Sequence, residues 1–259
     1  MRSFRSVLVG AVIATIFASG TLVTTVAAAV TVASTGATCT IIGTAGNDTL
    51  NGTANKDVIC GLGGADVVNG NGGDDTLDGG AGADTLNGGA GNDILVGGAG
   101  ADTLNGDAGT DTVTYVGVAA DVTADVDGVR DDGALGENDL VGVTVENLTG
   151  GSGNDTLTGS SAANVLSGGN GNDLLDGAAG SDTLNGDAGV DTVTYVDRTA
   201  IITANLDGVR NDGAASENDL IATTVENLIG GSGNDSLTGS ASDNSVDGRG
   251  GNDKLFESA

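Results

Sequence analysis

The chain has 259 residues, of which 48 are glycine and none is proline or histidine. Acidic residues number 36 against 8 basic ones, and the formal net charge of −28 predicts that the chain binds neither nucleic acid nor anionic membrane surfaces. Without histidine it forms no HExxH zinc site and no Ser-His-Asp triad, and its glycine loops lack the Gly-Lys-Ser/Thr of a phosphate-binding loop. We therefore predict that the chain is not an enzyme.

Residues 1–29 have the pattern of a secretory signal peptide. Arg2 and Arg5 precede an apolar stretch that begins at Val7, and three alanines at positions 27–29 offer a cleavage site. The alternative is an uncleaved membrane anchor, because the apolar stretch is long for a signal peptide, although serine, glycine and threonine residues interrupt it. We predict Sec-type export to an extracellular location, and association with the cell surface stays open.

Residues 30–42 precede the first repeat and are predicted to form an N-terminal cap. The two cysteines of the chain, Cys39 and Cys60, lie on either side of the first two repeats, and in an exported chain this predicts one disulfide bond. The bond would tie the leading edge to the second repeat and cap an otherwise open strand edge. Two unpaired thiols are the alternative.

Residues 43–114 consist of eight nonapeptides in unbroken register. The most regular stretch, residues 79–105, reads GGAGADTLN, GGAGNDILV and GGAGADTLN. Each repeat there has glycine at positions 1, 2 and 4, aspartate at position 6 and an aliphatic residue at position 8. The glycines permit a turn with positive φ angles and leave its carbonyl groups bare. Because calcium takes about six to eight oxygen ligands and accepts carbonyls mixed with carboxylates, such a turn predicts a calcium site.

Positions 7–9 of each repeat predict a very short strand in which only position 8 points inward. One repeat cannot close a core, so we predict an all-β fold, a parallel β-roll (β-solenoid) with two repeats per coil and turns on both edges. Turns two repeats apart would stack at the strand spacing of about 4.8 Å. A calcium ion between stacked turns would then contact two aspartates 18 residues apart in the sequence.

Two copies of another segment interrupt the repeats, at residues 115–140 and 195–220. They lie within a longer internal repeat, in which residues 102–181 match residues 182–259 at an offset of 80 residues and share DTVTYV, DGVR and ENDL. The regular phase resumes in residues 141–194 and again in residues 221–259, where the last repeats lie. Each copy is predicted to contain an inserted strand and an acidic loop.

The spacing across each interruption is close to a whole number of repeats. Asp111 and Glu146 hold position 6 on either side of the first copy and lie 35 residues apart, against 36 for four repeats. Alternating apolar residues around Ala124 predict a longer strand within this spacing. We therefore predict that the roll continues through each interruption as distorted coils with one bulging loop.

The acidic loops are a second candidate for metal binding. Four carboxylates in the first loop recur in the second: Asp127, Asp132, Glu137 and Asp139, then Asp207, Asp212, Glu217 and Asp219. Their spacing is not that of an EF-hand. A further calcium site and a solvated loop held by Arg130 or Arg210 both stay open.

The nonapeptides resemble the repeats-in-toxin (RTX) repeats of hemolysin-type calcium-binding proteins. Repeats starting at Gly79, Gly88, Gly97, Gly150, Gly168 and Gly230 match the full GGxGxDxU pattern, where U is aliphatic. The resemblance implies a right-handed parallel β-roll with several calcium ions between stacked turns. Asn164 and Asn244 stand at position 6 without a carboxylate.

Applied to this sequence, the pattern gives a set of candidate calcium ligands. The position-6 carboxylates are Asp48, Asp57, Asp66, Asp75, Asp84, Asp93, Asp102, Asp111, Asp155, Asp173, Asp182, Asp191, Asp235 and Asp253. The turn glycines are Gly82, Gly91, Gly100, Gly153, Gly171 and Gly233. The pairs predicted to share calcium are Asp66/Asp84, Asp75/Asp93, Asp84/Asp102, Asp93/Asp111, Asp155/Asp173, Asp173/Asp191 and Asp235/Asp253.

The functional prediction is a secreted calcium-binding protein whose roll folds when calcium binds. Each repeat buries only one aliphatic side chain, and the calcium-free roll would stack aspartates on one another. The alternative is an adhesin or surface-layer module that uses the calcium-stiffened roll to bind a glycan or a cell-surface partner. An ice-binding solenoid is a third interpretation, but the outward positions 7 and 9 vary too much for a flat threonine array.

Overall fold

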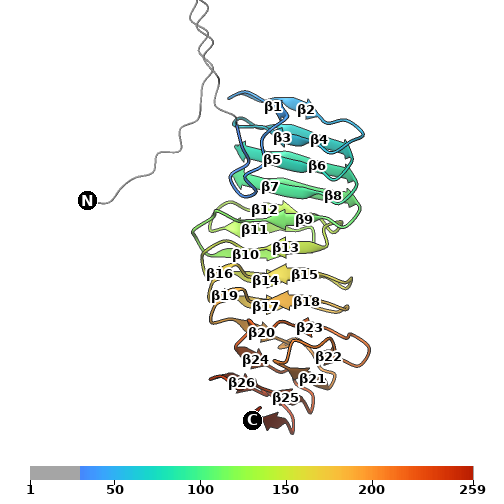
Figure 1. Ribbon diagram of the computed structural model, residues 1–259, viewed down its shortest axis with the longest axis vertical. Helices are drawn as coiled ribbons and strands as arrows, with labels where there is room; N and C mark the ends of the chain where they lie inside the picture. Colours follow the sequence, from blue (N-terminus) through green and yellow to red (C-terminus); the bar gives the residue numbers. More distant parts are fainter. Residues whose placement is uncertain (1–29, 259) are drawn as a thin grey trace, which may run out of the picture.

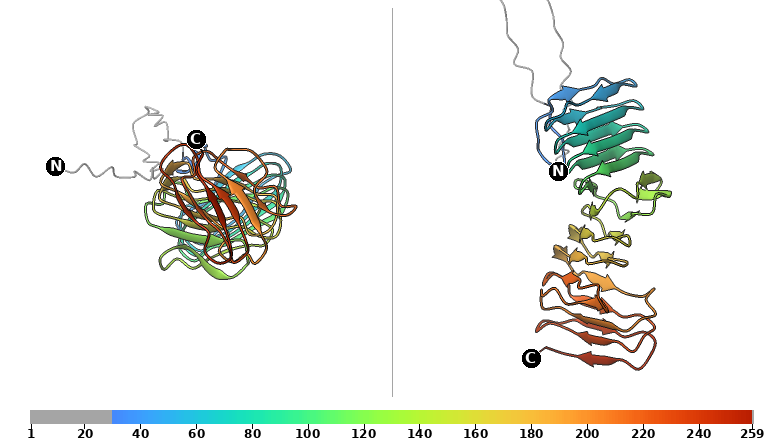
Figure 2. Two further views of the ribbon diagram at one scale, coloured as in Figure 1. Left: turned by 90° about the horizontal axis from the view of Figure 1, so that it is seen from below. Right: turned by 90° about the vertical axis from the view of Figure 1, so that its right-hand side faces the viewer.

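The structure is a computed structural model that describes residues 30–258 (Figure 1). The predicted signal peptide, residues 1–29, lies outside the described residues. Short strands stack into a long roll, and seen along the roll axis the coils superimpose (Figure 2). Within residues 30–258, no helix is long and apolar enough to span a membrane.

Two sheets form the faces of the roll. The nine-stranded sheet runs in the order β1 (Ile41–Ile42), β3 (Val58–Cys60), β5 (Thr76–Ala81), β7 (Ile94–Ala99), β9 (Thr112–Thr114), β13 (Asn147–Thr149), β15 (Val165–Ser167), β18 (Thr183–Asn185) and β23 (Leu220–Ile221). The 12-stranded sheet runs in the order β2 (Thr49–Asn51), β4 (Val67–Gly72), β6 (Thr85–Ala90), β8 (Thr103–Ala108), β12 (Asp139–Val141), β11 (Arg130–Ala134), β10 (Val122–Asp125), β14 (Thr156–Thr158), β17 (Leu174–Asp176), β20 (Thr192–Thr194), β24 (Asn227–Ile229) and β26 (Ser245–Asp247).

Two smaller sheets complete the described fold. A four-stranded sheet has the order β22 (Gly213–Ala214), β21 (Ile202–Asn205), β25 (Ser236–Thr238) and β27 (Lys254–Phe256). A two-stranded sheet joins β16 (Asn170–Gly171) and β19 (Ala188–Gly189) within stacked turns. The strands outside the interruptions pair in parallel and join residues 18 apart, such as Leu77 with Leu95, whereas Thr31 and Thr38 of the N-terminal segment form an antiparallel bridge. The predicted all-β parallel roll with two repeats per coil is confirmed.

The core is a column of position-8 side chains. Residues such as Leu77, Leu86 and Leu95 are fully buried, because the two sheets of a flattened coil face each other across this column. Positions 7 and 9 point outward, so each repeat contributes one core side chain worth roughly 1.5–3 kcal/mol. The column therefore fixes the register that stacks the turns along both edges.

Each interruption forms one enlarged coil, so the expectation of several distorted coils was wrong. β9 pairs directly with β13, Thr112 opposite Asn147, although 35 residues separate them in the sequence. The surplus residues form an antiparallel meander, in which β12 stacks on β8, β11 runs antiparallel, and β10 stacks on β14. Residue counting alone could not distinguish a second coil from a meander of equal length.

The two interruptions lie on opposite faces of the roll. The first belongs to the 12-stranded sheet, whereas in the second β23 stacks on β18 in the nine-stranded sheet. Figure 1 shows β10–β12 on the left side of the roll and β21–β23 on the right. The meanders bury Tyr115 and Tyr195, which enlarge the core at these two levels.

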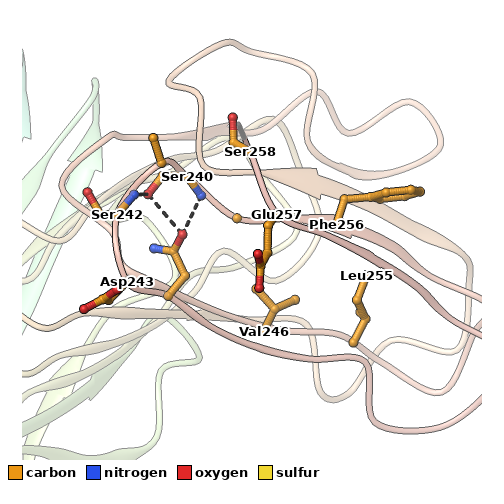
Figure 3. A pocket seen from close by; sticks show the side chains of 11 residues that line it. Ser240, Ser242, Asp243, Val246, Leu255, Phe256, Glu257 and Ser258 are labelled. Atoms are coloured by element: carbon orange, nitrogen blue, oxygen red, sulfur yellow. Dashed lines mark hydrogen bonds between the residues drawn. The ribbon is translucent and has the colours of Figure 1, made fainter.

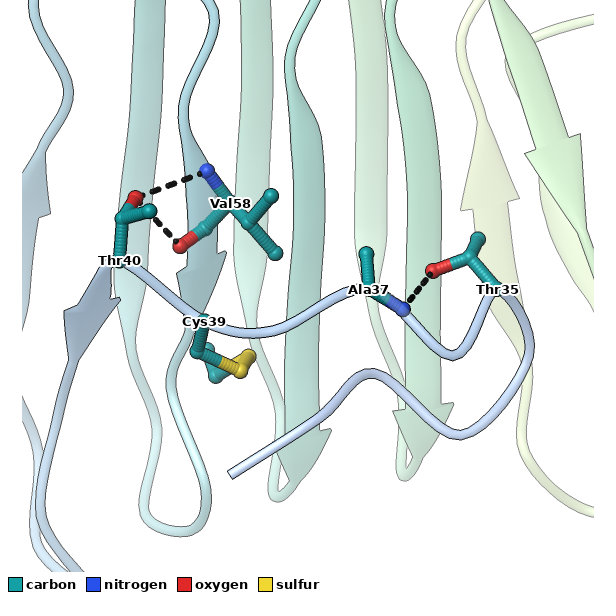
Figure 4. Close-up of a disulfide and its surroundings, with 6 residues drawn as sticks. Thr35, Ala37, Cys39, Thr40 and Val58 are labelled. Carbon is teal, nitrogen blue, oxygen red and sulfur yellow. Dashed lines mark hydrogen bonds between the residues drawn. A yellow bond between two sulfur atoms is a disulfide. The ribbon is translucent and has the colours of Figure 1, made fainter. Parts of the chain in front are cut away.

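The predicted disulfide between Cys39 and Cys60 is present (Figure 4). The Thr40 hydroxyl donates to the carbonyl oxygen of Val58 at 3.1 Å and accepts from its N–H at 3.0 Å. Val32 packs with both cysteines and Val58, and Val96 of β7 contacts the same cluster. Since Val58, Cys60 and Val96 are outward-facing positions, the N-terminal segment covers the outer face of the sheet rather than an open strand edge.

Candidate metal centre

The position-6 aspartates lie at the ends of the turns, immediately before the core strands. Although each carries a carboxylate, the aspartates of the central turns have only 0–2% of their surface exposed. Burial of this kind follows from the stacking, because each turn is covered by the turns of the coils before and after it. A buried carboxylate is costly unless each oxygen has a partner.

The first carboxylate oxygen of each aspartate has a protein partner. The Asp66 N–H donates to Asp84 Oδ1 at 2.7 Å, and the Asp84 N–H donates to Asp102 Oδ1 at 2.8 Å. The same bond joins every one of the seven predicted pairs, with donor–acceptor distances of 2.7–2.9 Å. The structure thus brings together all the aspartates predicted to lie side by side.

The second oxygen has no partner in many turns. Nine buried Oδ2 atoms in the described chain accept no hydrogen bond: those of Asp66, Asp75, Asp84, Asp93, Asp102, Asp111, Asp173, Asp182 and Asp191. Leaving one such group unpaired costs about 1–3 kcal/mol, and more when it is charged. Because this free-energy cost recurs at nine equivalent positions, the turns are expected to hold a ligand that comes from outside the protein.

The position-1 glycine shows where that ligand would lie. A Cβ atom on Gly79 would be 2.5 Å from Asp84 Oδ2 and 2.6 Å from the carbonyl oxygen of Gly97, which belongs to the next turn on the same edge. A carboxylate and a carbonyl therefore converge on a space that only glycine leaves free. An all-oxygen donor set of this kind fits calcium, and the absence of nitrogen and sulfur donors disfavours zinc.

Burial also raises the pKa values of these aspartates. Desolvation raises the pKa of Asp102 to about 6; the N–H bond from Asp84 lowers it and the Asp84 carboxylate raises it. The pKa of Asp182 rises to about 7, mainly through desolvation and secondarily through the Asp219 carboxylate, against the N–H bond from Asn164. In the absence of a cation, the turns therefore hold protons more tightly than free aspartate does.

Four of the predicted ligands differ from the others because their Oδ2 already has a protein partner. In each turn the residue at position 2 donates its backbone N–H, at 2.6–2.8 Å. The donor and acceptor pairs are Thr44 with Asp48, Thr53 with Asp57, Gly151 with Asp155, and Gly231 with Asp235. Asp253, in the last turn, is partly exposed and accepts the Asp235 N–H.

The predicted turn glycines divide in the same way. Gly82, Gly91, Gly100 and Gly171 have φ angles of 131–144°, a region that favours glycine. Gly153 and Gly233, in the turns of Asp155 and Asp235, are not in this region.

Sequence reasoning did not place Asp139 and Asp219 in the stacked series. Asp139 Oδ1 accepts the Asp102 N–H at 2.9 Å, and Asp219 Oδ1 accepts the Asp182 N–H at 2.9 Å, as in the regular repeats. Their Oδ2 atoms accept from the hydroxyls of Tyr115 at 3.5 Å and Tyr195 at 3.1 Å. The available signal was an aliphatic residue two positions later, Val141 after Asp139, which is the spacing between positions 6 and 8.

The acidic loop of the first interruption does not bring its four predicted carboxylates together as a ligand set. The oxygens of Asp132 accept the N–H groups of Asp125 and Val141, and Glu137 accepts the N–H of Ala134. Arg130 supports the loop by donating to backbone carbonyls and to the Thr103 hydroxyl.

A different group of carboxylates, which includes Asp127 of the predicted four, comes together at the start of the loop. Asp125, Asp127 and Asp131 place one carboxylate oxygen each within 4.8 Å of one another, and two of them are exposed. The second copy has asparagine at two of these three positions, Asn205 and Asn211.

A hollow of about 740 Å³ lies against the last coil (Figure 3). Its lining includes Ser240, Ser242, Asp243 and Phe256. The Ser240 hydroxyl donates to Asn244 Oδ1 at 3.0 Å and is therefore bonded to an amide rather than to a base. The hollow has no arrangement that would activate a nucleophile.

Comparison with known proteins agrees with the geometry of the turns. A search of curated proteins finds no match to this chain. The family model described as "RTX calcium-binding nonapeptide repeat (4 copies)" matches residues 40–68, 52–86, 61–95, 78–113, 144–175, 158–193 and 223–255. These matches cover more than half of the chain and omit both interruptions. The chain therefore belongs to the family of RTX calcium-binding nonapeptide repeat proteins.

Proposed function

We propose that this protein is exported and that its roll folds when calcium binds between stacked turns. The observation that carries the proposal is the set of nine buried Oδ2 atoms without partners. Calcium would be held by these aspartates and by the carbonyl oxygens of neighbouring glycines, and would supply the positive charge that the turns lack. Repeats of this family are binding and structural modules, so the proposed role involves no catalysis.

The energetics of stacking support folding on calcium binding. Without a cation, the roll stacks ionised aspartates at the strand spacing of about 4.8 Å in a chain of net charge −28. A ligand that binds only the folded state stabilises that state by its binding free energy. Because each coil contacts only its neighbours, an ordered coil templates the next, and the transition is expected to be cooperative.

The covalent structure supports the proposed location. The Cys39–Cys60 disulfide is a bond that persists in oxidising compartments outside the cytosol. Extracellular modules bind calcium at about 10⁻⁴–10⁻³ M, a range in which calcium would be available to an exported chain. The signal-like residues 1–29 agree with this route.

Circular dichroism during a calcium titration of chelator-treated protein tests the proposal. We expect a low-structure spectrum that converts cooperatively to a β-rich one at about 10⁻⁴–10⁻³ M calcium, the range of extracellular modules. Magnesium is the control and should substitute poorly, because it requires a tight octahedral site. A β-rich spectrum that is unchanged after exhaustive chelation would show that the fold does not need the ion.

A further inference from the structure

The conformation of the residue at position 2 divides the turns, apart from those of Glu146 and Glu226, into two classes. In ten turns of the described chain it has a φ angle of 58–105°: Leu62, Asn71, Gly80, Gly89, Gly98, Asp107, Gly169, Ala178, Asp187 and Arg249. Four residues later, nine of these ten turns carry the nine unpartnered Oδ2 atoms, and the tenth carries Asp253. We name these ten the open turns.

In the other class, the position-2 residue forms a hydrogen bond with the position-6 side chain of the same turn. Its N–H donates to a side-chain oxygen of position 6 at 2.6–2.8 Å, and the position-2 residues are Thr44, Thr53, Gly151, Ser160, Gly231 and Ser240. The threonine and serine hydroxyls donate to the same oxygen, as Figure 3 shows for Ser240. We name these six the closed turns.

The two classes differ in what the carboxylate can accept. Oδ2 lies beside the position-1 glycine in turns of both classes, for example at Gly79 and Gly150. In an open turn the position-2 amide does not donate to this oxygen, and in nine of the ten open turns Oδ2 is buried without a partner. In a closed turn the same oxygen is already bonded. Closed turns also accept a neutral side chain, since Asn164 and Asn244 occupy position 6 in two of them.

Six open turns keep the positive φ although position 2 is not glycine, at Leu62, Asn71, Asp107, Ala178, Asp187 and Arg249. A left-handed conformation at a non-glycine residue costs free energy and persists only when its surroundings stabilise it. In five of these six turns, all except that of Arg249, an unpartnered buried carboxylate adds a second cost. A bound cation offsets both costs, and a closed turn has neither.

The sequence motif does not decide the class. Turns 150–155 and 230–235 both read GGSGND and are closed. Each stacks on a meander segment instead of a glycine turn: the Ser152 N–H donates to the Val118 carbonyl, and the Ser232 N–H to the Arg198 carbonyl, both at 2.9 Å. The neighbouring turn, together with position 2, therefore sets whether the carboxylate stays available.

We infer that the backbone conformation at position 2 marks which turns take calcium, so that calcium binds at the open turns and the six closed turns hold the roll without it. This inference rests on the proposed calcium binding. It confines calcium to residues 61–111, residues 168–191 and the last turn. A pair of closed turns precedes each of these three zones.

Matched variants on one edge test the inference through the number of calcium ions bound to the full chain, measured by equilibrium dialysis with calcium alone. Asp75→Asn alters an open turn, and Asp57→Asn alters the closed turn stacked on it. We expect Asp75→Asn to lose at least one calcium equivalent and Asp57→Asn to lose none. Equal losses in both variants would overturn the inference, whereas a wild-type chain that binds no calcium would overturn the proposed function instead.

A second pair acts on position 2 itself. Asn71→Thr introduces the residue found in the closed turns of Thr44 and Thr53, and a β-branched side chain disfavours the φ of 72° that Asn71 has. Asn71→Gly is the control, since it keeps that conformation accessible and also removes the Asn71 side-chain bond to the Gly52 carbonyl. We expect Asn71→Thr to bind at least one calcium equivalent fewer than Asn71→Gly, and equal binding would contradict the inference.

Discussion

Residues 61–111 and residues 230–244 are built on the same repeat, but their position-6 side chains differ in their hydrogen-bond partners. Both stretches contribute to the buried column of position-8 side chains, with Leu86 in the first and Leu237 in the second fully covered. In the first, all six position-6 aspartates have an unpartnered Oδ2, whereas in the second Asp235 and Asn244 accept hydrogen bonds from their own turns. The difference shows that the core and the metal site are separable features of one repeat.

Calcium removal should produce the largest difference between these stretches, and we expect to see it in their hydrogen-exchange rates. In chelator, backbone amides of residues 61–111 lose the cation that offsets their stacked carboxylates, so hydrogen exchange there should accelerate more than in residues 230–244. Hydrogen–deuterium exchange measured by mass spectrometry, with and without calcium, checks this. Equal acceleration in the two stretches would mean that the closed turns depend on calcium as strongly as the open ones.

Core truncation should affect both stretches alike. Leu86→Ala and Leu237→Ala each remove a fully buried side chain, and each should lower the free energy of unfolding by about 2–5 kcal/mol. Chemical denaturation in saturating calcium measures both variants. A large loss at Leu86 with almost none at Leu237 would show that the second stretch does not share the core of the first.

In calcium-free protein, lowering the pH should reduce the difference in stability between residues 61–111 and residues 230–244. Burial raises the pKa values of Asp75, Asp102 and Asp111 to about 6 from the ordinary aspartate value of 3.8. A group whose pKa is raised by folding contributes stability below its unfolded pKa, and this contribution is lost as the pH rises through about 6. Circular dichroism in chelator should therefore show more β structure near pH 4 than near pH 7.5. A β-structure content that rises with pH over this range would contradict the raised pKa values.

Proton binding should also oppose calcium binding over the same range. Because Asp102 must ionise to accept the ion, the apparent calcium affinity should fall as the pH drops through about 6. Isothermal titration calorimetry at pH 7.5 and pH 5 measures this, and proton release on calcium binding should be largest near the pKa. A calcium affinity that is independent of pH in this range would place the ion away from the buried carboxylates.

The smallest expected effect concerns a closed turn. Thr53→Val removes the hydroxyl that donates to Asp57 Oδ2 at 2.9 Å and keeps the N–H bond at 2.7 Å. We expect a loss of about 0.5–1.5 kcal/mol in the free energy of unfolding, because one neutral donor to a charged acceptor disappears from an exposed turn. Chemical denaturation in saturating calcium measures it, and Thr85→Val, at an outward strand position, is the control. A Thr53→Val variant that binds fewer calcium equivalents than the wild-type chain would assign Thr53 to a metal site.

Most of the architecture could be predicted because the repeat is local. Position 8 is aliphatic in each nonapeptide and position 6 is acidic in all but those of Asn164 and Asn244, so the buried column, the 18-residue register and the pairing of Asp66 with Asp84 all follow from the period. The disulfide also followed from the sequence, since the chain has only Cys39 and Cys60 to join. These features depend on residue spacing, which the sequence states directly.

The tertiary structure alone decided which carboxylates remain available and where the meanders lie. Gly80 and Gly151 both follow a glycine at position 1 of a consensus turn, yet only Gly80 has a positive φ, because Gly151 stacks on the segment around Val118 rather than on a glycine turn. The partner of a carboxylate oxygen is set by backbone orientation in a turn that can be 33 residues away, as between Val122 and Asp155. A periodic sequence determines which residues repeat, but the hydrogen bonds of each repeat depend on the conformation of the coil beneath it.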